Sequence, residues 1–218
     1  MSRRPSLDPR RVREEIALAA ARLIAEEGLD YAQAKRKAAR RLLGESRLAG
    51  DWLPDNEMVE AEVQEYLALF QSETQPAELR RLRRIALGWM EKLAPFAPHL
   101  VGAVLNGTAN EHSDVHLQTF SDSPKDVAIF LLNQRIQYDV SETTHFAGRG
   151  LVETLSFLWR DSRDADYVGV HLALYTSTDL RGALRGDARG RPVRIDANAL
   201  RALLEADPAP PAPQPEGS

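Results

Sequence analysis

One aspartate and three histidines are the side chains whose types and spacing could do chemistry together: His112, Asp114, His116 and His171. Asp114 and His116 stand two residues apart in an alternating segment, so a strand there would direct both to one face. His171 lies in a second such segment and could reach them from an adjacent strand. A three-ligand set of this kind could bind Zn²⁺ with one open position. The alternative is that these histidines are surface or hydrogen-bonded strand residues.

The surrounding segment, Val101 to Leu117, reads VGAVLNGTANEHSDVHL. A small apolar run ends in Gly102-Ala103, a turn-rich stretch follows, and a second strand is expected from Ser113. This outline resembles the signature of the nucleotidyltransferase superfamily: a strand, a Gly-Ser-type turn, about ten residues, and an Asp-x-Asp pair on the next strand. The resemblance covers residues 95–176, the second half of the chain without its last two expected helices and tail.

The resemblance implies a transfer reaction in which backbone N–H groups of the glycine turn approach a triphosphate and carboxylates hold Mg²⁺ or another divalent cation. Asp114 corresponds to the first metal carboxylate, with His116 beside it as a metal ligand. His171 joins them as the third catalytic residue. The residues implied in nucleotide binding are Gly102, Ala103, Gly107, Thr108, Ser113, Lys125 and Arg181.

The chain departs from the family pattern at three of these positions. Ala103 stands where the family has Ser, and His116 stands where it has the second carboxylate. His171 occupies the strand that would carry a third Asp. Imidazole is a poor ligand for Mg²⁺, so the implied metal site is degenerate.

Two functions therefore stay open. The first is a nucleotidyltransferase that moves a nucleotidyl group from an NTP to an unknown acceptor. The second is an inactive module of the same fold that binds a nucleotide, RNA or a protein partner through the basic N-terminal helices. The chain also resembles an uncharacterised family of bacterial proteins through SD-x-x-L-x-x-F-x-D-x-x-K-D-V and LY-x-x-x-D-L-R-G.

Charge is distributed unevenly along the chain. The net charge is -4, yet residues 1–50 carry twelve Lys and Arg against seven Asp and Glu. The basic residues expected on the second helix are Lys35, Arg36, Arg40 and Arg41, and Arg80 to Arg84 supply a second group. Together they could track the phosphates of RNA. The alternative is a solvated face with i,i+4 pairing to Glu.

Several classes of protein are not indicated. The chain has no cysteine, which excludes disulfides, Cys-based zinc sites and a Cys nucleophile. It shows no signal-peptide core and no apolar run of membrane-spanning length, so we expect a cytoplasmic protein without membrane contact. G-x-S-x-G, G-x-G-x-x-G and Walker motifs are all missing, so neither a serine hydrolase nor a dinucleotide or P-loop fold is indicated.

Apolar periodicity predicts the organisation of the chain. Helical spacing recurs from Asp8 to Pro95, with starts at Asp8-Pro9, Asp30, Asp55 or Asn56, and Pro76. Strands are expected at 99–106, 113–120, 136–140, 151–160 and 168–175, with helices after Ser123-Pro124, around 178–184 and at 196–206. The predicted fold class is α+β: a helical region (1–95) packed on a nucleotidyltransferase-like mixed β-sheet with flanking helices (96–206). A Pro-rich, disordered tail is expected at 207–218.

Overall fold

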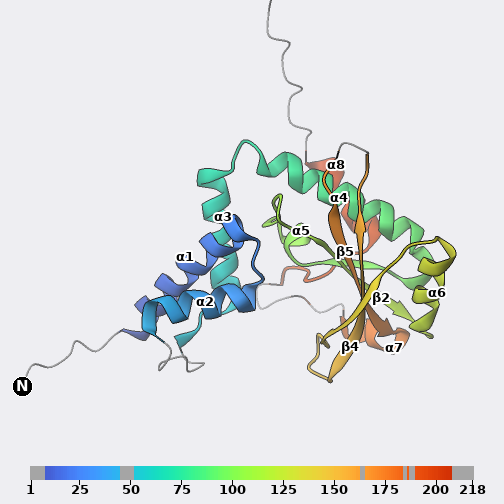
Figure 1. Cartoon of the computed structure of the whole chain (residues 1–218), viewed down its shortest axis with the longest axis horizontal. Helices are drawn as coiled ribbons and strands as arrows, with labels where there is room; N and C mark the ends of the chain where they lie inside the picture. Colours follow the sequence, from blue (N-terminus) through green and yellow to red (C-terminus); the bar gives the residue numbers. More distant parts are fainter. Residues whose placement is uncertain (1–7, 45–51, 163–164, 184–185, 187–189, 208–218) are drawn as a thin grey trace, which may run out of the picture. The chain divides into compact units, whose positions relative to one another are not determined.

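The computed structural model describes residues 8–44, 52–162, 165–183, 186 and 190–207 (Figure 1). The chain forms two compact units, Met1–Gln75 and Pro76–Ser218, and each has a hydrophobic core of its own. The expected boundary at residue 95 lies one helix too late, because helix 75–92 packs its apolar stripe on the sheet. Residues 208–218, for which we expected a disordered tail, lie outside the described residues.

In its described residues, the first unit contains three α-helices: α1 (Pro9–Glu27), α2 (Tyr31–Leu43) and α3 (Asn56–Phe70). Each starts after an aspartate whose carboxylate accepts a backbone N–H of the first turn, at 2.7–3.0 Å. These caps are Asp8 and Asp30, as the sequence predicted, and Asp55, where the sequence left Asp55 and Asn56 open. Gly28 ends α1 in the left-handed conformation (φ 66°). Alanines fill much of the buried contact between α1 and α2, and such small side chains let helix axes approach closely.

The second unit is built on one mixed sheet with the strand order β1-β2-β5-β4-β3. The strands are β1 (His99–Val101), β2 (Val115–Ser121), β3 (Asp139–Thr144), β4 (Leu151–Trp159) and β5 (Val168–Thr176). β2 and β5 run parallel, and the other neighbours are antiparallel. The helical elements are α4 (Gln75–Lys92), η3 (Ala94–Phe96), α5 (Ala103–Asn106), α6 (Lys125–Asn133), α7 (Ser177–Ala183) and α8 (Ala197–Ala206). The α+β class with a mixed sheet and flanking helices is thereby confirmed.

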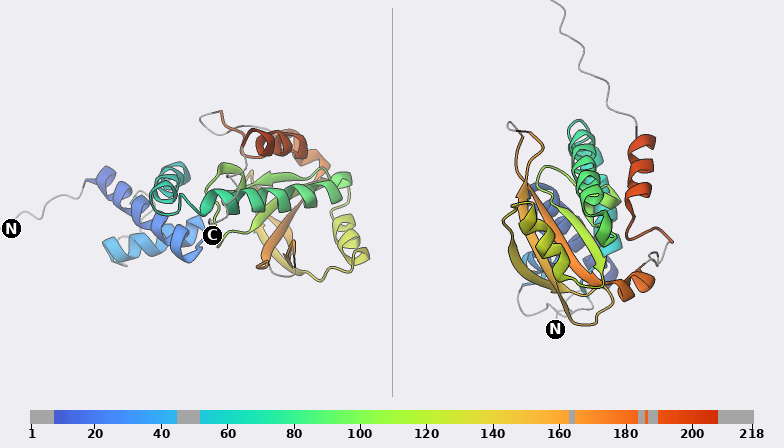
Figure 2. Two further views of the ribbon diagram at one scale, coloured as in Figure 1. Left: turned by 90° about the horizontal axis from the view of Figure 1, so that it is seen from above. Right: turned by 90° about the vertical axis from the view of Figure 1, so that its right-hand side faces the viewer.

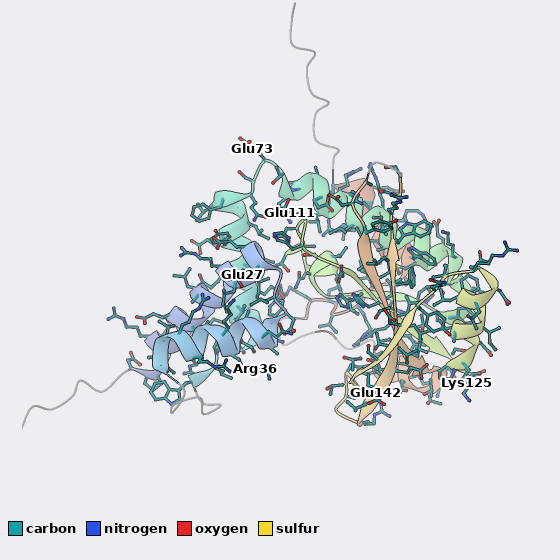
Figure 3. All side chains as sticks on the ribbon, viewed as in Figure 1. Glu27, Arg36, Glu73, Glu111, Lys125 and Glu142 are labelled. Atoms are coloured by element: carbon teal, nitrogen blue, oxygen red, sulfur yellow. The ribbon has the colours of Figure 1, made fainter. Side chains whose placement is uncertain are left out.

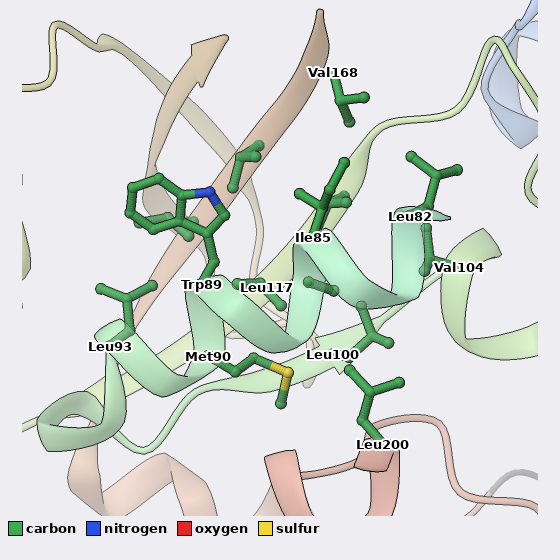
Figure 4. Close-up of a cluster of buried hydrophobic side chains, with 14 of the residues drawn as sticks. Leu82, Ile85, Trp89, Met90, Leu93, Leu100, Val104, Leu117, Val168 and Leu200 are labelled. Atoms are coloured by element: carbon green, nitrogen blue, oxygen red, sulfur yellow. The ribbon is translucent and has the colours of Figure 1, made fainter. Parts of the chain in front are cut away.

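Helix α4 supplies the stripe that covers one face of the sheet, with α8 beside it (Figure 2). Its buried residues meet side chains of β1, α5, β2, β5 and α8 in the cluster drawn in Figure 4. Trp89 makes edge contacts with Phe157 (ring centroids 4.7 Å apart) and Trp159 (5.1 Å). Pro95 falls in the 3-10 turn that follows, consistent with the predicted end of the helix.

The two faces of the sheet differ in character. On the α4 side, Val115 and Leu117 of β2 and Val170 and Leu172 of β5 are fully or almost fully buried. Residues between them point to the opposite face because side chains alternate along a strand. One end of that opposite face is closed by a small apolar cluster that includes Phe120, Tyr175 and Ala183. The other end carries the polar side chains described below.

Two expected strands differ from the observed ones, and both differences come from a turn. Residues 99–106 were predicted as one strand, but β1 ends at Val101 because Gly102 turns the chain at φ 74° and α5 follows. The strand predicted from residue 136 begins instead at Asp139. Arg135, a non-glycine residue with φ 58°, lies in the connection that delays it.

Candidate functional site

Four polar residues form one row across the open face of the sheet. His116 of β2 pairs with His171 of β5, His171 pairs with Ser156 of β4, and Ser156 pairs with Asp139 of β3. We call these residues the polar row. Because neighbouring strands are about 5 Å apart, side chains at paired positions can touch. The imidazoles of His116 and His171 are stacked, with centroids 4.6 Å apart and planes inclined by 16°.

Asp114 precedes β2 and joins the row from the same face. Its Oδ1 accepts the backbone N–H of Gly169 at 2.9 Å, and its Oδ2 lies 3.0 Å from Nε2 of His171. A Cβ on Gly169 would lie 2.5 Å from Cγ of Asp114, so the carboxylate occupies the space that any other residue at 169 would need. Only glycine, which has no Cβ, leaves room at position 169 for the carboxylate of Asp114.

The second nitrogen of His171 faces a hydroxyl. Nδ1 of His171 lies 2.8 Å from Oγ of Ser156. A carboxylate can only accept hydrogen bonds, so in the neutral ring Nε2 carries the proton and Nδ1 accepts from the Ser156 hydroxyl. The three groups form a directed chain from Ser156 through His171 to Asp114. We call this hydrogen-bonded chain the relay.

Electrostatics keep Asp114 ionised and His116 neutral. The hydrogen bond from His171, followed by that from Gly169 N–H, holds the pKa of Asp114 below its usual value despite partial burial. The pKa of His116 falls to about 4, first because surrounding protein displaces water and then because of the charge of His171. His116 is nonetheless exposed by its accessible surface, so solvent screens part of this effect.

A cavity of about 690 Å³ lies beside the relay. Asp114, His171 and Ser156 line one side of it. Arg135, Tyr138 and Trp159 also line the cavity, although the Trp159 ring itself packs against Trp89 and Lys92 on the α4 side. No ion pair of Arg135 is found within the part of the chain that the structure describes. The volume lies in the range of sites that hold a small organic ligand.

The glycine turn of the signature lies next to this site. Val101 pairs with His116, so Gly102 and Ala103 follow directly beside the start of β2. Gly102 has φ 74° and ψ −153°, which only glycine adopts readily. Ala103 begins α5, and its carbonyl accepts N–H groups from Gly107, Thr108 and Ala109.

Three other predicted nucleotide-binding residues stabilise the turn itself. Gly107 ends α5 with φ 87°. Thr108 is buried, and its hydroxyl donates to Oδ1 of Asn106 at 2.7 Å. Ser113 uses its hydroxyl to accept the N–H of Asn110 at 3.0 Å. These contacts explain the residues' presence without a ligand.

Lys125 and Arg181 lie at the far end of the sheet from Asp114. Lys125 begins α6 after the end of β2, and Arg181 lies in α7 after the end of β5 (Figure 3 labels Lys125). Asp114 precedes β2, and the seven residues of that strand span about 23 Å. The fold therefore brings Asp114, His116 and His171 together, but not Lys125 or Arg181 with them.

The donor set does not fit the magnesium site that the resemblance implied. Mg²⁺ prefers oxygen ligands, whereas this cluster offers one carboxylate and two imidazoles. Both oxygens of Asp114 are already hydrogen-bonded. Among the described residues, no group of three or more His, Asp or Glu side chains has an arrangement that could hold a metal ion. His112 lies near Glu111, 3.7 Å away, outside the relay.

The basic residues of α2 divide into two kinds. Lys35 is half-buried and donates to the Pro54 carbonyl (3.1 Å) and to Asn56 Oδ1 (2.8 Å), which ties α2 to the start of α3. Arg36, Arg40 and Arg41 are exposed on α2 (Figure 3 labels Arg36).

The arginines of α4 mostly serve their own unit. Arg83 is buried and donates to the Val104 carbonyl at 3.1 Å, and Arg81 pairs with Glu78 (2.9 Å) and Asp161 (3.3 Å). Arg80 bonds the Asp207 carbonyl. Arg84 alone of this group is exposed. The expected phosphate-tracking surface is thus not formed by α4.

Sequence reasoning missed Ser156, Gly169 and Arg135. Ser156 carries no motif because its partner His171 comes from another strand. Gly169 left a usable signal, since an isolated glycine within a strand pattern marks a bulge or a close approach. Arg135 lay in a connection that we had read as leading straight into a strand.

Comparisons with known proteins add no identification. The chain matches no family model, no curated protein and no solved structure. None of the helices in the described residues is both long enough and apolar enough to cross a membrane.

Proposed function

We propose that the second unit is a nucleotidyltransferase-like module that binds a nucleotide in the cavity beside Asp114 and lacks metal-dependent transfer. The observation that carries the proposal is the register of β1, β2 and β5. It supports the resemblance because a glycine turn, the first signature carboxylate and a residue of the parallel neighbouring strand all meet at one end of the sheet.

The cavity lining suits a nucleotide. Tyr138, which is half-buried at the cavity wall, offers an aromatic ring for a base, and such stacking contributes about 1–3 kcal/mol per base in nucleic-acid complexes. Arg135 offers a guanidinium, which matches phosphate oxygens in geometry and charge. Arg135 can contact the phosphates directly, so this site needs no metal ion between the protein and the nucleotide.

The same geometry argues against transfer chemistry of the family's kind. That chemistry needs carboxylates from two strands to hold divalent metal at the reacting phosphate. Here His116 and His171 stand at two of those positions, and both carboxylate oxygens of Asp114 accept hydrogen bonds, from Gly169 N–H and from His171. The inactive alternative of the two functions is therefore the one we advance.

Isothermal calorimetry with ATP, GTP, CTP and UTP, each with Mg²⁺ or with EDTA, tests the proposal. We expect one nucleotide to bind in EDTA. Arg135→Gln should weaken it about tenfold or more, because a hydrogen bond to a charged group contributes about 1.5–3 kcal/mol. Arg84→Gln, which removes an exposed arginine outside the cavity, is the matched control and should bind as the parent does.

Two results would overturn the proposal. Binding of none of the four nucleotides would remove the nucleotide site altogether. Binding that requires Mg²⁺ and disappears in Asp114→Asn would instead restore the metal-dependent transferase.

A further inference from the structure

A hydroxyl, an imidazole and a carboxylate in one hydrogen-bonded chain at a cavity wall is the arrangement that activates a serine. Ser156, His171 and Asp114 meet this description at 2.8 Å and 3.0 Å, and all three line the cavity. They come from three different segments of the chain, so no local sequence motif contains them. The geometry resembles that of a Ser-His-Asp triad with the two ring nitrogens exchanged.

We propose that Ser156 is an activated nucleophile that accepts an acyl group from a carboxylic ester held in this cavity. This activity goes beyond nucleotide binding and does not depend on it. Asp114 is a positioning residue, which holds the proton of His171 on Nε2 and leaves Nδ1 free to act as base.

The reaction balances with water as the second reactant. Ser156 Oγ attacks the ester carbonyl carbon while its proton passes to Nδ1 of His171. The tetrahedral intermediate collapses, the bond to the alcohol oxygen breaks, and that oxygen takes the proton from Nδ1. Water then attacks the acyl-serine by the same proton route, which releases the acid and restores the Ser156 hydroxyl.

Negative charge on the intermediate must be met by side chains. β4 is paired on both sides at Ser156, with β3 and with β5, so its backbone N–H groups there are used within the sheet and do not point at the intermediate. Arg135 is the cation in the cavity lining and can supply the opposing charge. A substrate whose leaving group is good, and so needs little help from an oxyanion site, is accordingly the first probe.

The absence of cysteine from the chain allows a selective test of activation at position 156. In Ser156→Cys, a thiol replaces the hydroxyl, and alkylation by iodoacetamide across pH 5 to 10 reports its ionisation. A neighbouring imidazole lowers the pKa of a thiol, often by one unit or more. We expect the midpoint of the rate profile to lie at least one unit below that of Ser141→Cys.

Ser141→Cys is a matched control because Ser141 lies on the adjacent strand β3, is exposed, and pairs with Thr154 rather than with a neighbour of His171. Adding His171→Gln to Ser156→Cys should return the midpoint to the control value. Equal midpoints at the two positions, or a midpoint at 156 unaffected by His171→Gln, would overturn the proposal. Ser156 is less exposed than Ser141, and burial raises the pKa of a thiol, so a lower midpoint at position 156 cannot be produced by the difference in burial.

The native chain is tested with p-nitrophenyl acetate. We expect one acetyl group per chain, mapped by mass spectrometry to Ser156, and a burst of nitrophenolate that Ser156→Ala removes while Ser141→Ala keeps it. Thermal unfolding of both variants shows whether the sheet is intact. Acetylation that maps only to other residues, with Ser156→Ala unchanged in a folded protein, would refute the nucleophile. Neither experiment contains a nucleotide, so failure here leaves the proposed binding function standing.

Discussion

The second unit holds two His-Asp pairs of similar geometry in different surroundings. His171 and Asp114 are 3.0 Å apart, with 26% and 45% of their side-chain surfaces exposed. His145 and Asp179 are 3.3 Å apart, with only 7% and 11% exposed. One pair opens on a cavity, and the other is enclosed near the opposite end of the sheet, beside the apolar cluster of Phe120, Tyr175 and Ala183.

The partners of each pair differ as much as the burial does. Nδ1 of His145 accepts the N–H of Ala147, while Asp179 accepts from the N–H and hydroxyl of Thr176 and pairs with Arg149 at 3.1 Å. Every polar atom there is used within the fold. The Thr176 hydroxyl is the main cause that holds the pKa of Asp179 below its usual value. In the open pair, by contrast, the ring's second nitrogen meets a serine hydroxyl at a cavity wall. The enclosed pair is a structural clamp, and the open pair is the one suited to chemistry.

Removal of each carboxylate should separate the two roles most strongly. Asp179→Ala leaves His145, Thr176 and Arg149 without their acceptor, and loss of one partner of a buried pair costs about 3 kcal/mol or more. Asp114→Ala removes a half-exposed carboxylate and should cost at most about 1 kcal/mol. Urea unfolding measures both.

The experiment should be run in a Trp52→Phe background, so that Trp89 and Trp159 report the second unit alone. Equal losses for the two variants would contradict the assignment of one pair to structure and the other to chemistry.

A methyl group on Gly169 should damage the open pair selectively. In Gly169→Ala the new Cβ would lie 2.5–2.7 Å from three atoms of the Asp114 carboxyl group. The carboxylate must then move away from Gly169 N–H and from His171, and we expect a loss of about 1–3 kcal/mol, as for other overpacked sites. NMR of the imidazole nitrogens should show that His171 loses its bonded Nε2 proton.

Gly88→Ala is the matched control for this substitution. Nothing lies within 4 Å of a Cβ there, and the position is inside α4, so the variant should gain about 0.5–1 kcal/mol. If Gly169→Ala left both the stability and the His171 proton unchanged, the close approach of Asp114 to Gly169 would contribute nothing to the stability of the fold.

The sequence was sufficient for the local parts of the fold. Caps at Asp8, at Asp30 and at Asp55 or Asn56 were predicted because the cap and the N–H groups it bonds are neighbours in sequence. The apolar stripe of α4 and the alternation in β5 were visible for the same reason. The partner of that stripe was not, because an apolar helix face gives no information on which surface it covers, and the domain boundary moved accordingly.

The site was predictable only in its first half. Asp114 and His116 were grouped because they stand two positions apart, and His171 was proposed from a second strand. Ser156 could not be found, because it enters through the order β2-β5-β4, which follows from the sheet and not from spacing. Lys125 and Arg181 were grouped with Asp114 because the strand order was not known. In the structure, Asp114 lies before β2, whereas Lys125 and Arg181 follow the opposite ends of β2 and β5.

The smallest expected effect concerns the ring stacked on the open pair. The pKa of His116 is lowered to about 4, mainly by desolvation and then by His171, from an ordinary value near 6.5. The unfolded chain therefore binds more protons at this residue between pH 6.5 and 4, and the free energy of unfolding falls as the pH drops through that window. Because the ring is partly exposed, solvent screening reduces the size of the loss. The pKa of Asp114 is also lowered, but Asp114 contributes to the pH dependence only below its usual pKa near 4, so the two residues act in different pH ranges.

The difference between the parent and His116→Gln in urea unfolding at pH 7, 5.5 and 4.5 isolates the histidine. The advantage of the parent over the variant should shrink steadily towards pH 4.5. A difference that stays constant over this range would mean that His116 titrates alike in the folded and unfolded chain, and that its stacking on His171 leaves its charge unaffected.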